Sequence, residues 1–167
     1  EAVVVFIGPC TSKKLEALDT NIKSSVDFVL TFEELMGMFV AKDVEPMDIE
    51  IEDDVEDSSA LGRGYPVAGG VAAAVKKVAE EIDPSREILI EGANSLSECV
   101  KMLKVAKAGR KNGYLLEGMA CPGGCVAGVG TIQSTTRVKK NVDQFMKNSK
   151  YKDPFENEKI KGYKFED

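Results

Sequence analysis

Four short apolar runs along the chain predict β-strands. They read "VVVFI" (3–7), "VDFVL" (26–30), "REILIEG" (86–92) and "GYLLEGM" (113–119). β-Branched and aromatic residues dominate the first run, which ends at a Gly-Pro pair, as is typical of a fully buried strand.

Between these runs, apolar residues recur every three or four positions and predict amphipathic helices. Thr31 with Glu34, and Ser95 with Glu98, form two capping boxes at helix starts. Thr11 or Ser12 is the expected cap of the helix after the first strand. The expected helices occupy residues 10–18, 32–42, 61–83 (after a glycine-rich lead-in), 95–103 and 135–148.

This alternation of strands and helices predicts an α/β fold with a mostly parallel four-stranded sheet and helices on both faces. Residues 1–150 would form one α/β lobe, and residues 151–167 a polar C-terminal tail. The lobe includes an acidic loop at 43–57 that lacks Lys and Arg. A solvated loop is the favoured interpretation of that loop, since an EF-hand would need a glycine that it lacks.

Composition restricts the class of protein. The chain has 167 residues, of which 43% are hydrophobic and 30% charged, as in one globular domain. A net charge of −6 argues against a nucleic-acid partner, and no apolar run approaches membrane-spanning length. The first residues lack the basic region of a signal peptide, so we expect a cytoplasmic protein with reduced thiols. Because a strand pattern begins at residue 2, we also expect a piece of a longer protein.

The chain contains no histidine and four cysteines. Ser-His-Asp or Cys-His catalysis and mixed Cys/His zinc sites are therefore excluded within this chain. A metal bound here would take thiolate or carboxylate ligands, and thiolates favour zinc, copper(I) or iron–sulfur clusters.

Three of the four cysteines follow predicted strands. The first strand runs into Cys10, and the fourth runs into the stretch "EGMACPGGCVAGVG", which carries Cys121 and Cys125. Parallel strands would bring these thiols to one sheet edge. The glycines between Cys121 and Cys125 would let backbone amides approach a bound cluster. From spacing alone, a metal site, a redox pair and chance all remain open. Cys99 lies on a helix's apolar stripe and is interpreted as a core residue.

Cys10 strengthens the case for a metal. It precedes a predicted helix, whose N-terminal dipole favours an anion, and Lys13 and Lys14 add positive charge one turn away. Lys13 has an alternative interpretation as a solvated surface residue. Together with the missing histidine, these residues point to an iron–sulfur site that lacks one ligand.

Three segments of the chain resemble sequence signatures of a known protein family. "PCTSKKLEA" is similar to the second signature of the iron-only (FeFe) hydrogenases, P-C-x-x-K-x-x-E. "EGMACPGGCVAGVG" is similar to their third signature, E-x-M-A-C-x-x-G-C-x-x-G, and "GRGYPVAGGVAAAV" to their glycine-rich helix lead-in. The matching signature residues are Pro9, Cys10, Lys13, Glu16, Glu117, Met119, Ala120, Cys121, Gly124, Cys125 and Gly128.

The resemblance implies an H-cluster, in which a 4Fe–4S cubane joins a two-iron unit bearing CO, cyanide and a bridging dithiolate. Cys10 and Cys121 would ligate the cubane, and Cys125 would bridge to the two-iron unit. Lys13 would donate a hydrogen bond to a cyanide ligand. Met119 would pack against the two-iron unit, and Glu16 would orient Lys13. Pro9 and Gly124 would complete the cofactor-binding set, and the implied reaction is reversible reduction of protons to hydrogen.

Departures from the family pattern carry further expectations. The first signature, T-S-C-C-P or a variant, is absent, so an upstream remainder of the protein would supply the fourth cysteine. Gly8 replaces a methionine, and Val129 interrupts a glycine run, which resembles divergent, sensory branches. Electrons would come from a partner such as ferredoxin, since no accessory cluster motif is present. The isolated chain would be inactive.

Three alternatives accompany this interpretation. One is a hydrogenase-related protein that carries a 4Fe–4S cluster but no two-iron unit. Another is a partner-binding domain that has lost its cofactor. The last is a zinc site built from Cys10, Cys121, Cys125 and an outside ligand.

Overall fold

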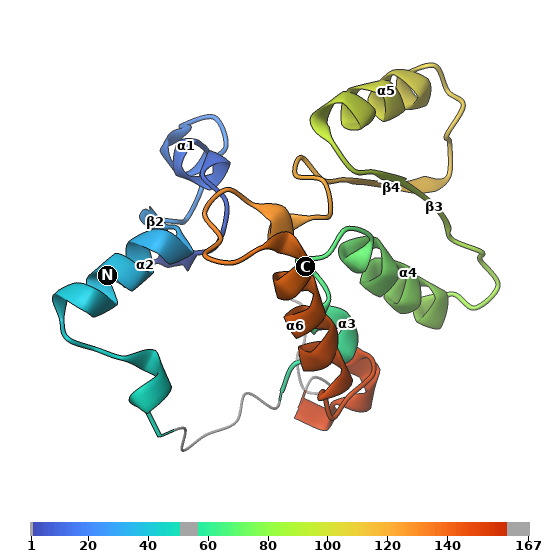
Figure 1. Cartoon of the computed structure of the whole chain (residues 1–167). Helices are drawn as coiled ribbons and strands as arrows, with labels where there is room; N and C mark the ends of the chain where they lie inside the picture. The colour runs from blue at the N-terminus through green and yellow to red at the C-terminus, as the bar shows by residue number, and fades with distance from the viewer. Residues whose placement is uncertain (1, 51–56, 160–167) are drawn as a thin grey trace.

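The computed structural model describes residues 2–50 and 57–159, so part of the predicted acidic loop (51–56) and the end of the predicted tail (160–167) lie outside the described residues. Four strands and six α-helices are described (Figure 1). The strands are β1 (Val5–Ile7), β2 (Phe28–Leu30), β3 (Leu89–Ala93) and β4 (Tyr114–Gly118). The helices are α1 (Ser12–Leu18), α2 (Phe32–Ala41), α3 (Ala60–Arg63), α4 (Gly70–Ile82), α5 (Leu96–Lys107) and α6 (Thr135–Lys147), with 3₁₀ turns η1 (Pro46–Asp48), η2 (Cys125–Ala127) and η3 (Pro154–Glu156).

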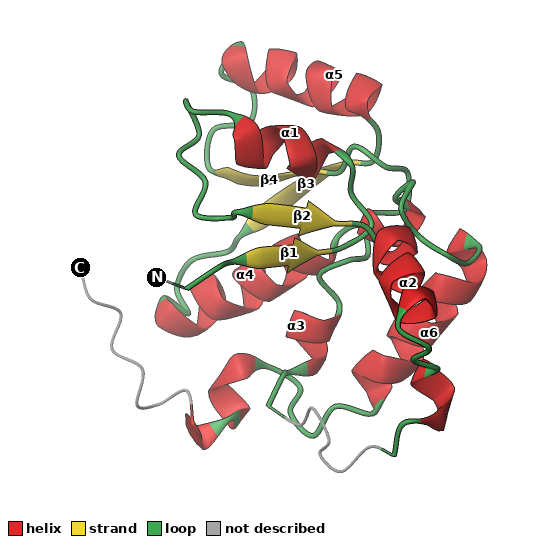
Figure 2. Cartoon of the chain, turned by 90° about the vertical axis from the view of Figure 1, so that its left-hand side faces the viewer, coloured by secondary structure: helices red, strands yellow, loops and turns green. Residues whose placement is uncertain are grey.

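Two βαβ units make up the described chain, and the predicted α/β class with parallel strands is confirmed. In the first unit β1 pairs in parallel with β2, and α1 connects them (Figure 2). In the second unit β3 pairs in parallel with β4 through α5. Helices α4 and α5 lie on opposite faces of the β3–β4 pair (Figure 1).

The prediction of one four-stranded sheet is wrong, because the described strands form two separate two-stranded sheets. Each crossover helix returns the chain beside the strand that it left, which builds a local parallel pair. A connection containing η1, α3 and α4 separates the two units and does not place β2 beside β3. Apolar patterning predicted where strands occur, but it carries no information on which strands pair.

The prediction that the first strand is fully buried is also wrong. Val5 and Ile7 are each 45% exposed. On α5, Leu96, Val100 and Leu103 have the spacing of core residues and are nevertheless exposed. The chain exposes 12,708 Å², whereas a compact monomer of 18.1 kDa exposes about 8,100 Å². Many apolar side chains of the described residues are therefore exposed to solvent.

The capping boxes position two helices. At the start of α2, the Thr31 hydroxyl accepts the Glu34 amide and the Glu34 carboxylate accepts the Thr31 amide, as predicted. At the start of α5, the Ser95 hydroxyl accepts the Glu98 amide at 3.3 Å. The Glu98 carboxylate accepts from Asn94 instead of Ser95, so only half of this predicted box forms.

The beginning of the predicted polar tail packs against α3. The Tyr151 carbonyl oxygen accepts from the Ala60 amide at 2.7 Å. Asn157 is 2% exposed and donates its side-chain amide to the Asp57 carbonyl oxygen at 2.8 Å. Within the described ranges, no helix has the length and apolar character needed to cross a membrane.

Candidate metal centre

The first cysteine-bearing segment follows β1. The Gly8 amide donates to the Leu30 carbonyl oxygen at 3.0 Å and continues the strand pairing to the turn. Cys10 then lies directly before Thr11, which occupies the N-cap position of α1 but does not use its hydroxyl as a cap. The half-buried Cys10 thus stands at the carboxyl end of β1.

The second cysteine-bearing segment follows β4. The Met119 amide donates to the Ala93 carbonyl oxygen at 2.8 Å, which fixes the end of the strand. The chain then turns through Gly123 and Gly124, whose φ angles of +100° and +96° favour glycine. A side chain on Gly124 would also lie 2.5 Å from the backbone nitrogen of Ala68. This loop is therefore tightly constrained between Cys121 and Cys125.

The two segments meet directly. The Gly130 amide donates to the Pro9 carbonyl oxygen at 3.0 Å. Gly128 is buried, and a Cβ atom at this position would collide with that same carbonyl oxygen. The close approach holds the loop after Cys125 against the residue before Cys10.

Electrostatics at Cys125 report the same proximity. Burial raises the pKa of the Cys125 thiol, and the neighbouring thiols of Cys10 and Cys121 raise it further. The Lys13 ammonium acts in the opposite direction and lowers this pKa. The Cys125 thiol therefore lies within electrostatic reach of Cys10, Cys121 and Lys13.

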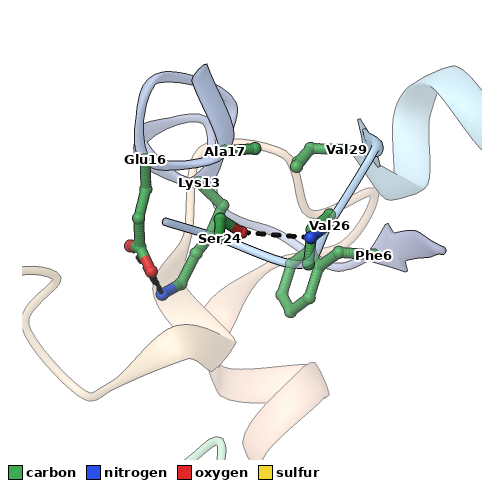
Figure 3. Close-up of a pocket in the computed structure, with 7 residues that line it drawn as sticks. All are labelled: Phe6, Lys13, Glu16, Ala17, Ser24, Val26 and Val29. Atoms are coloured by element: carbon green, nitrogen blue, oxygen red, sulfur yellow. Dashed lines mark hydrogen bonds and ion pairs between the residues drawn. The ribbon is translucent and has the colours of Figure 1, made fainter. Parts of the chain in front are cut away.

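Lys13 and Glu16 form an ion pair on α1. The Lys13 ammonium donates to both carboxylate oxygens of Glu16, at 2.8 and 2.7 Å. Both side chains line a pocket of about 100 Å³ against β1 and β2, whose apolar wall includes Phe6 and Val29 (Figure 3). Lys14 instead donates to Glu34 on α2. Of the two lysines, Lys13 is therefore the one that acts on the cysteine thiols.

Glu117 has a structural role that motif matching does not provide. Its carboxylate accepts the Ala72 amide at 2.9 Å and also the Gly69 amide. It therefore caps the start of α4, where Gly69 offers no side chain. A charged residue near the end of an otherwise apolar strand was the available signal for this role.

Asn94 is a second residue that sequence reasoning missed. Its Oδ1 atom accepts the Gly123 amide at 2.7 Å, in the middle of the cysteine loop. The Ala68 amide donates to the Gly123 carbonyl oxygen on the other side of the same residue, at 3.0 Å. Asn94 belongs to no motif, and the sequence contains no signal for this contact.

Met119 and Cys99 lie beside each other. The Cys99 sulfur lies 3.8 Å from the Met119 carbonyl oxygen, behind the strand end. Cys99 is half-buried on α5, and its sulfur also lies 4.0 Å from the Ala93 carbonyl oxygen of β3.

The donor chemistry of the site fits an iron–sulfur cluster. Three thiols from two segments converge with a lysine, and thiolates are the ligands of such clusters. In the part of the chain that the structure describes, no three Cys, Asp or Glu side chains are arranged to hold a single metal ion. Zinc would draw its sulfur ligands to about 2.3 Å, so a zinc site here would require the three thiols to move closer together. A multi-metal cluster accepts more widely separated thiols.

Fold and site together define an α/β domain whose strand-end cysteines have the donor chemistry of a thiolate-bound metal centre. Residues 1–129 match the iron-only hydrogenase large subunit, C-terminal domain. Since this match covers most of the chain, the chain belongs to that family.

Three relatives are similar in sequence. Iron hydrogenase 1 of Clostridium pasteurianum is 26% identical over 83% of this chain. The NADP-reducing hydrogenase subunit HndD of Solidesulfovibrio fructosivorans is 27% identical over 77%, and the periplasmic [Fe] hydrogenase large subunit of Nitratidesulfovibrio vulgaris is 28% identical over 78%. The matches span only 30%, 27% and 39% of the relatives' own lengths.

Solved structures show the same fold. A structure of apo [FeFe]-hydrogenase from Chlamydomonas reinhardtii aligns with a TM-score of 0.63 at 20% identity, covering 95% of this chain and 57% of that one. An [FeFe]-hydrogenase structure from work on oxygen inactivation aligns with the same score and coverage at 19% identity. The chain therefore has an FeFe-hydrogenase-like fold.

Proposed function

We propose that this chain forms the C-terminal part of an FeFe-hydrogenase catalytic domain, which holds the H-cluster for reversible reduction of protons to hydrogen. The hydrogen bond between Gly130 and Pro9 is the observation that carries the proposal. It joins the loop after Cys125 to the residue before Cys10, and the influence of Cys10, Cys121 and Lys13 on the pKa of Cys125 supports the same grouping.

In this proposal the thiols divide the work of binding. Cys10 and Cys121 would ligate the cubane, and Cys125 would hold the two-iron unit. When bound, the cluster supplies the redox chemistry that joins protons and electrons into hydrogen. The protein positions the cluster and shields it from water. Gly124 and Pro9 serve this purpose by allowing the loops to approach closely.

Lys13 and Glu16 orient charge at the site. The Lys13 ammonium donates to a cyanide ligand, as a charge-assisted hydrogen bond. Glu16, which accepts from Lys13 at 2.7 Å, restricts where the ammonium lies. Met119 packs against the two-iron unit from the end of β4.

The remaining ligand and the partners follow from the same proposal. An N-terminal remainder of the protein supplies the fourth cysteine and covers exposed apolar residues such as Val3 and Phe28. An electron carrier such as ferredoxin exchanges electrons with the full-length protein in the cytoplasm. The chain without that remainder is inactive, because three thiolates do not hold the complete cluster.

A low-turnover hydrogen sensor is the finer assignment that Gly8 favours. A Cβ atom at Gly8 would lie 2.8 Å from the Phe6 ring, so a methionine at this position would require the ring to move. The site therefore lacks the methionine that would touch the two-iron unit.

Infrared spectroscopy on the full-length protein, matured with its cluster, tests the proposal. Bands from CO and cyanide ligands support it. A bound 4Fe–4S cluster without such bands would favour the hydrogenase-related protein that lacks the two-iron unit. Cys→Ser variants at Cys10, Cys121 and Cys125 should each lose bound iron, while Cys99→Ser should keep it, because Cys99 faces backbone carbonyl oxygens and is not among the thiols that act on Cys125.

A further inference from the structure

Gly123 occupies the centre of the loop between Cys121 and Cys125. Its φ is +100°, and the neighbouring Gly124 amide closes the turn onto the Cys121 carbonyl oxygen at 2.9 Å. The Gly123 amide takes its acceptor from another element. Asn94 provides that acceptor at 2.7 Å.

Asn94 is itself firmly placed. Its backbone amide donates to the Glu98 carboxylate at 2.7 Å. The carbonyl oxygen of the preceding Ala93, which is 5% exposed, accepts from Met119 at 2.8 Å. Asn94 thus links the start of α5, the end of β3 and the cysteine loop.

The choice of an amide side chain also has an electrostatic reason. A carboxylate would accept the same hydrogen bond, but its negative charge would repel thiolates bound to a cluster. Asn94 supplies an acceptor without a charge. We propose that Asn94 is a positioning residue, which fixes Gly123 so that Cys121 and Cys125 keep their separation. This inference rests on the proposed function, because it assigns those thiols to a cluster.

Hydrogen exchange and cluster retention in the full-length protein test this role. Asn94→Ala removes the acceptor, and exchange in a peptide covering residues 119–130 should accelerate about tenfold at one amide, since one hydrogen bond is lost. Iron release to a chelator should also become faster. Asn94→Asp keeps the acceptor, so exchange should stay unchanged while the reduction potential of the cluster moves to more negative values.

Asn112→Ala is the matched control, because Asn112 lies in the turn between α5 and β4, at the other end of α5. It should change neither exchange in the loop nor iron release. Exchange in peptides from β3 and β4 reports whether each variant is folded. If Asn94→Ala unfolds, Asn94→Ser takes its place, since the shorter side chain does not reach Gly123.

Unchanged loop exchange in the Ala or Ser variant would overturn the contact. Faster exchange with unchanged iron release would overturn the role toward the thiols. If the wild-type protein binds no cluster, the proposed function fails together with this role, while the exchange data still decide whether Asn94 fixes the loop.

Discussion

The Gly130 amide donates to the Pro9 carbonyl oxygen, and this bond joins two loops that are far apart in the sequence. Gly128 lies against the same carbonyl oxygen, and a Cβ atom at this position would collide with it. The two cysteine segments are thus held by backbone contacts, which depend on glycine more than on any charged group. This dependence leads to a direct prediction.

Gly128→Ala should separate the two loops. The added methyl group would collide with the backbone carbonyl oxygen of the half-buried Pro9 and must displace it. The free energy of unfolding should therefore fall by about 1–3 kcal/mol. Bound iron in the full-length protein should fall as well. Chemical denaturation and iron analysis measure the two effects.

Gly37→Ala is the control for that substitution. Gly37 lies inside α2, and a Cβ atom there meets nothing within 4 Å. Alanine is the better helix former, so this variant should be more stable by about 0.5–1 kcal/mol. A Gly128→Ala protein as stable and as rich in iron as Gly37→Ala would contradict the close-approach argument.

The sequence predicted the local elements well. Thr31 and Glu34 identify the start of α2 because both partners of a capping box lie within one turn. Strand pairing and burial were not predictable in this way. Val5 and Ile7 have the character of a buried strand, yet their burial depends on surfaces that this chain does not provide.

The candidate site shows the same difference between local features, which the sequence predicts, and remote contacts, which it does not. Cys10 and Cys121 could be found because strand ends and cysteines are both visible in a sequence. Asn94 could not, because it contacts a backbone amide that is remote in the sequence. The charge of Glu117 near the end of β4 signalled a polar role, but not which remote backbone amides it caps. Every residue except proline carries a backbone N–H, so the residue type does not reveal which of these groups a side chain will contact.

Glu117→Gln should weaken the start of α4. The neutral amide oxygen still accepts hydrogen bonds from Gly69 and Ala72, but it loses the attraction between a carboxylate and the helix N-terminus. We expect a loss of about 0.3–1 kcal/mol in the free energy of unfolding. Faster hydrogen exchange at the first turn of α4 should accompany this loss.

Glu80→Gln serves as the control, since Glu80 lies on the same helix and pairs with Lys76 at 3.4 Å. A surface pair one turn apart contributes little. If both variants lost equal stability, the capping role of Glu117 would be refuted.

The Lys14–Glu34 pair should produce an acid-dependent stability. Its hydrogen bonds, first that with Lys14 and then that with the Thr31 backbone, lower the pKa of Glu34 to about 2. Because the folded pKa lies below the unfolded value of 4.5, the stabilisation is complete above pH 4.5. It is lost as the pH falls toward 2.

Glu34→Gln should therefore be less stable than the wild type at pH 7, with the difference shrinking between pH 4.5 and 2. Thermal unfolding across this range measures the difference. Glu33→Gln, one residue earlier on α2, is the control and should show no such pH profile. A constant difference at all pH values would show that the pair does not couple to folding.

Glu16→Gln should loosen Lys13. The ammonium now donates to both Glu16 oxygens within 2.8 Å, and a neutral amide offers one acceptor and no charge. In the full-length matured protein, the cyanide infrared bands should shift or broaden. Hydrogen evolution should fall about tenfold, because the charge-assisted hydrogen bond that orients Lys13 is lost. Glu34→Gln breaks the pair that the neighbouring Lys14 of α1 makes with α2, and it should leave the bands unchanged. Sharp, unshifted bands in Glu16→Gln would mean that Lys13 is oriented by the cluster alone.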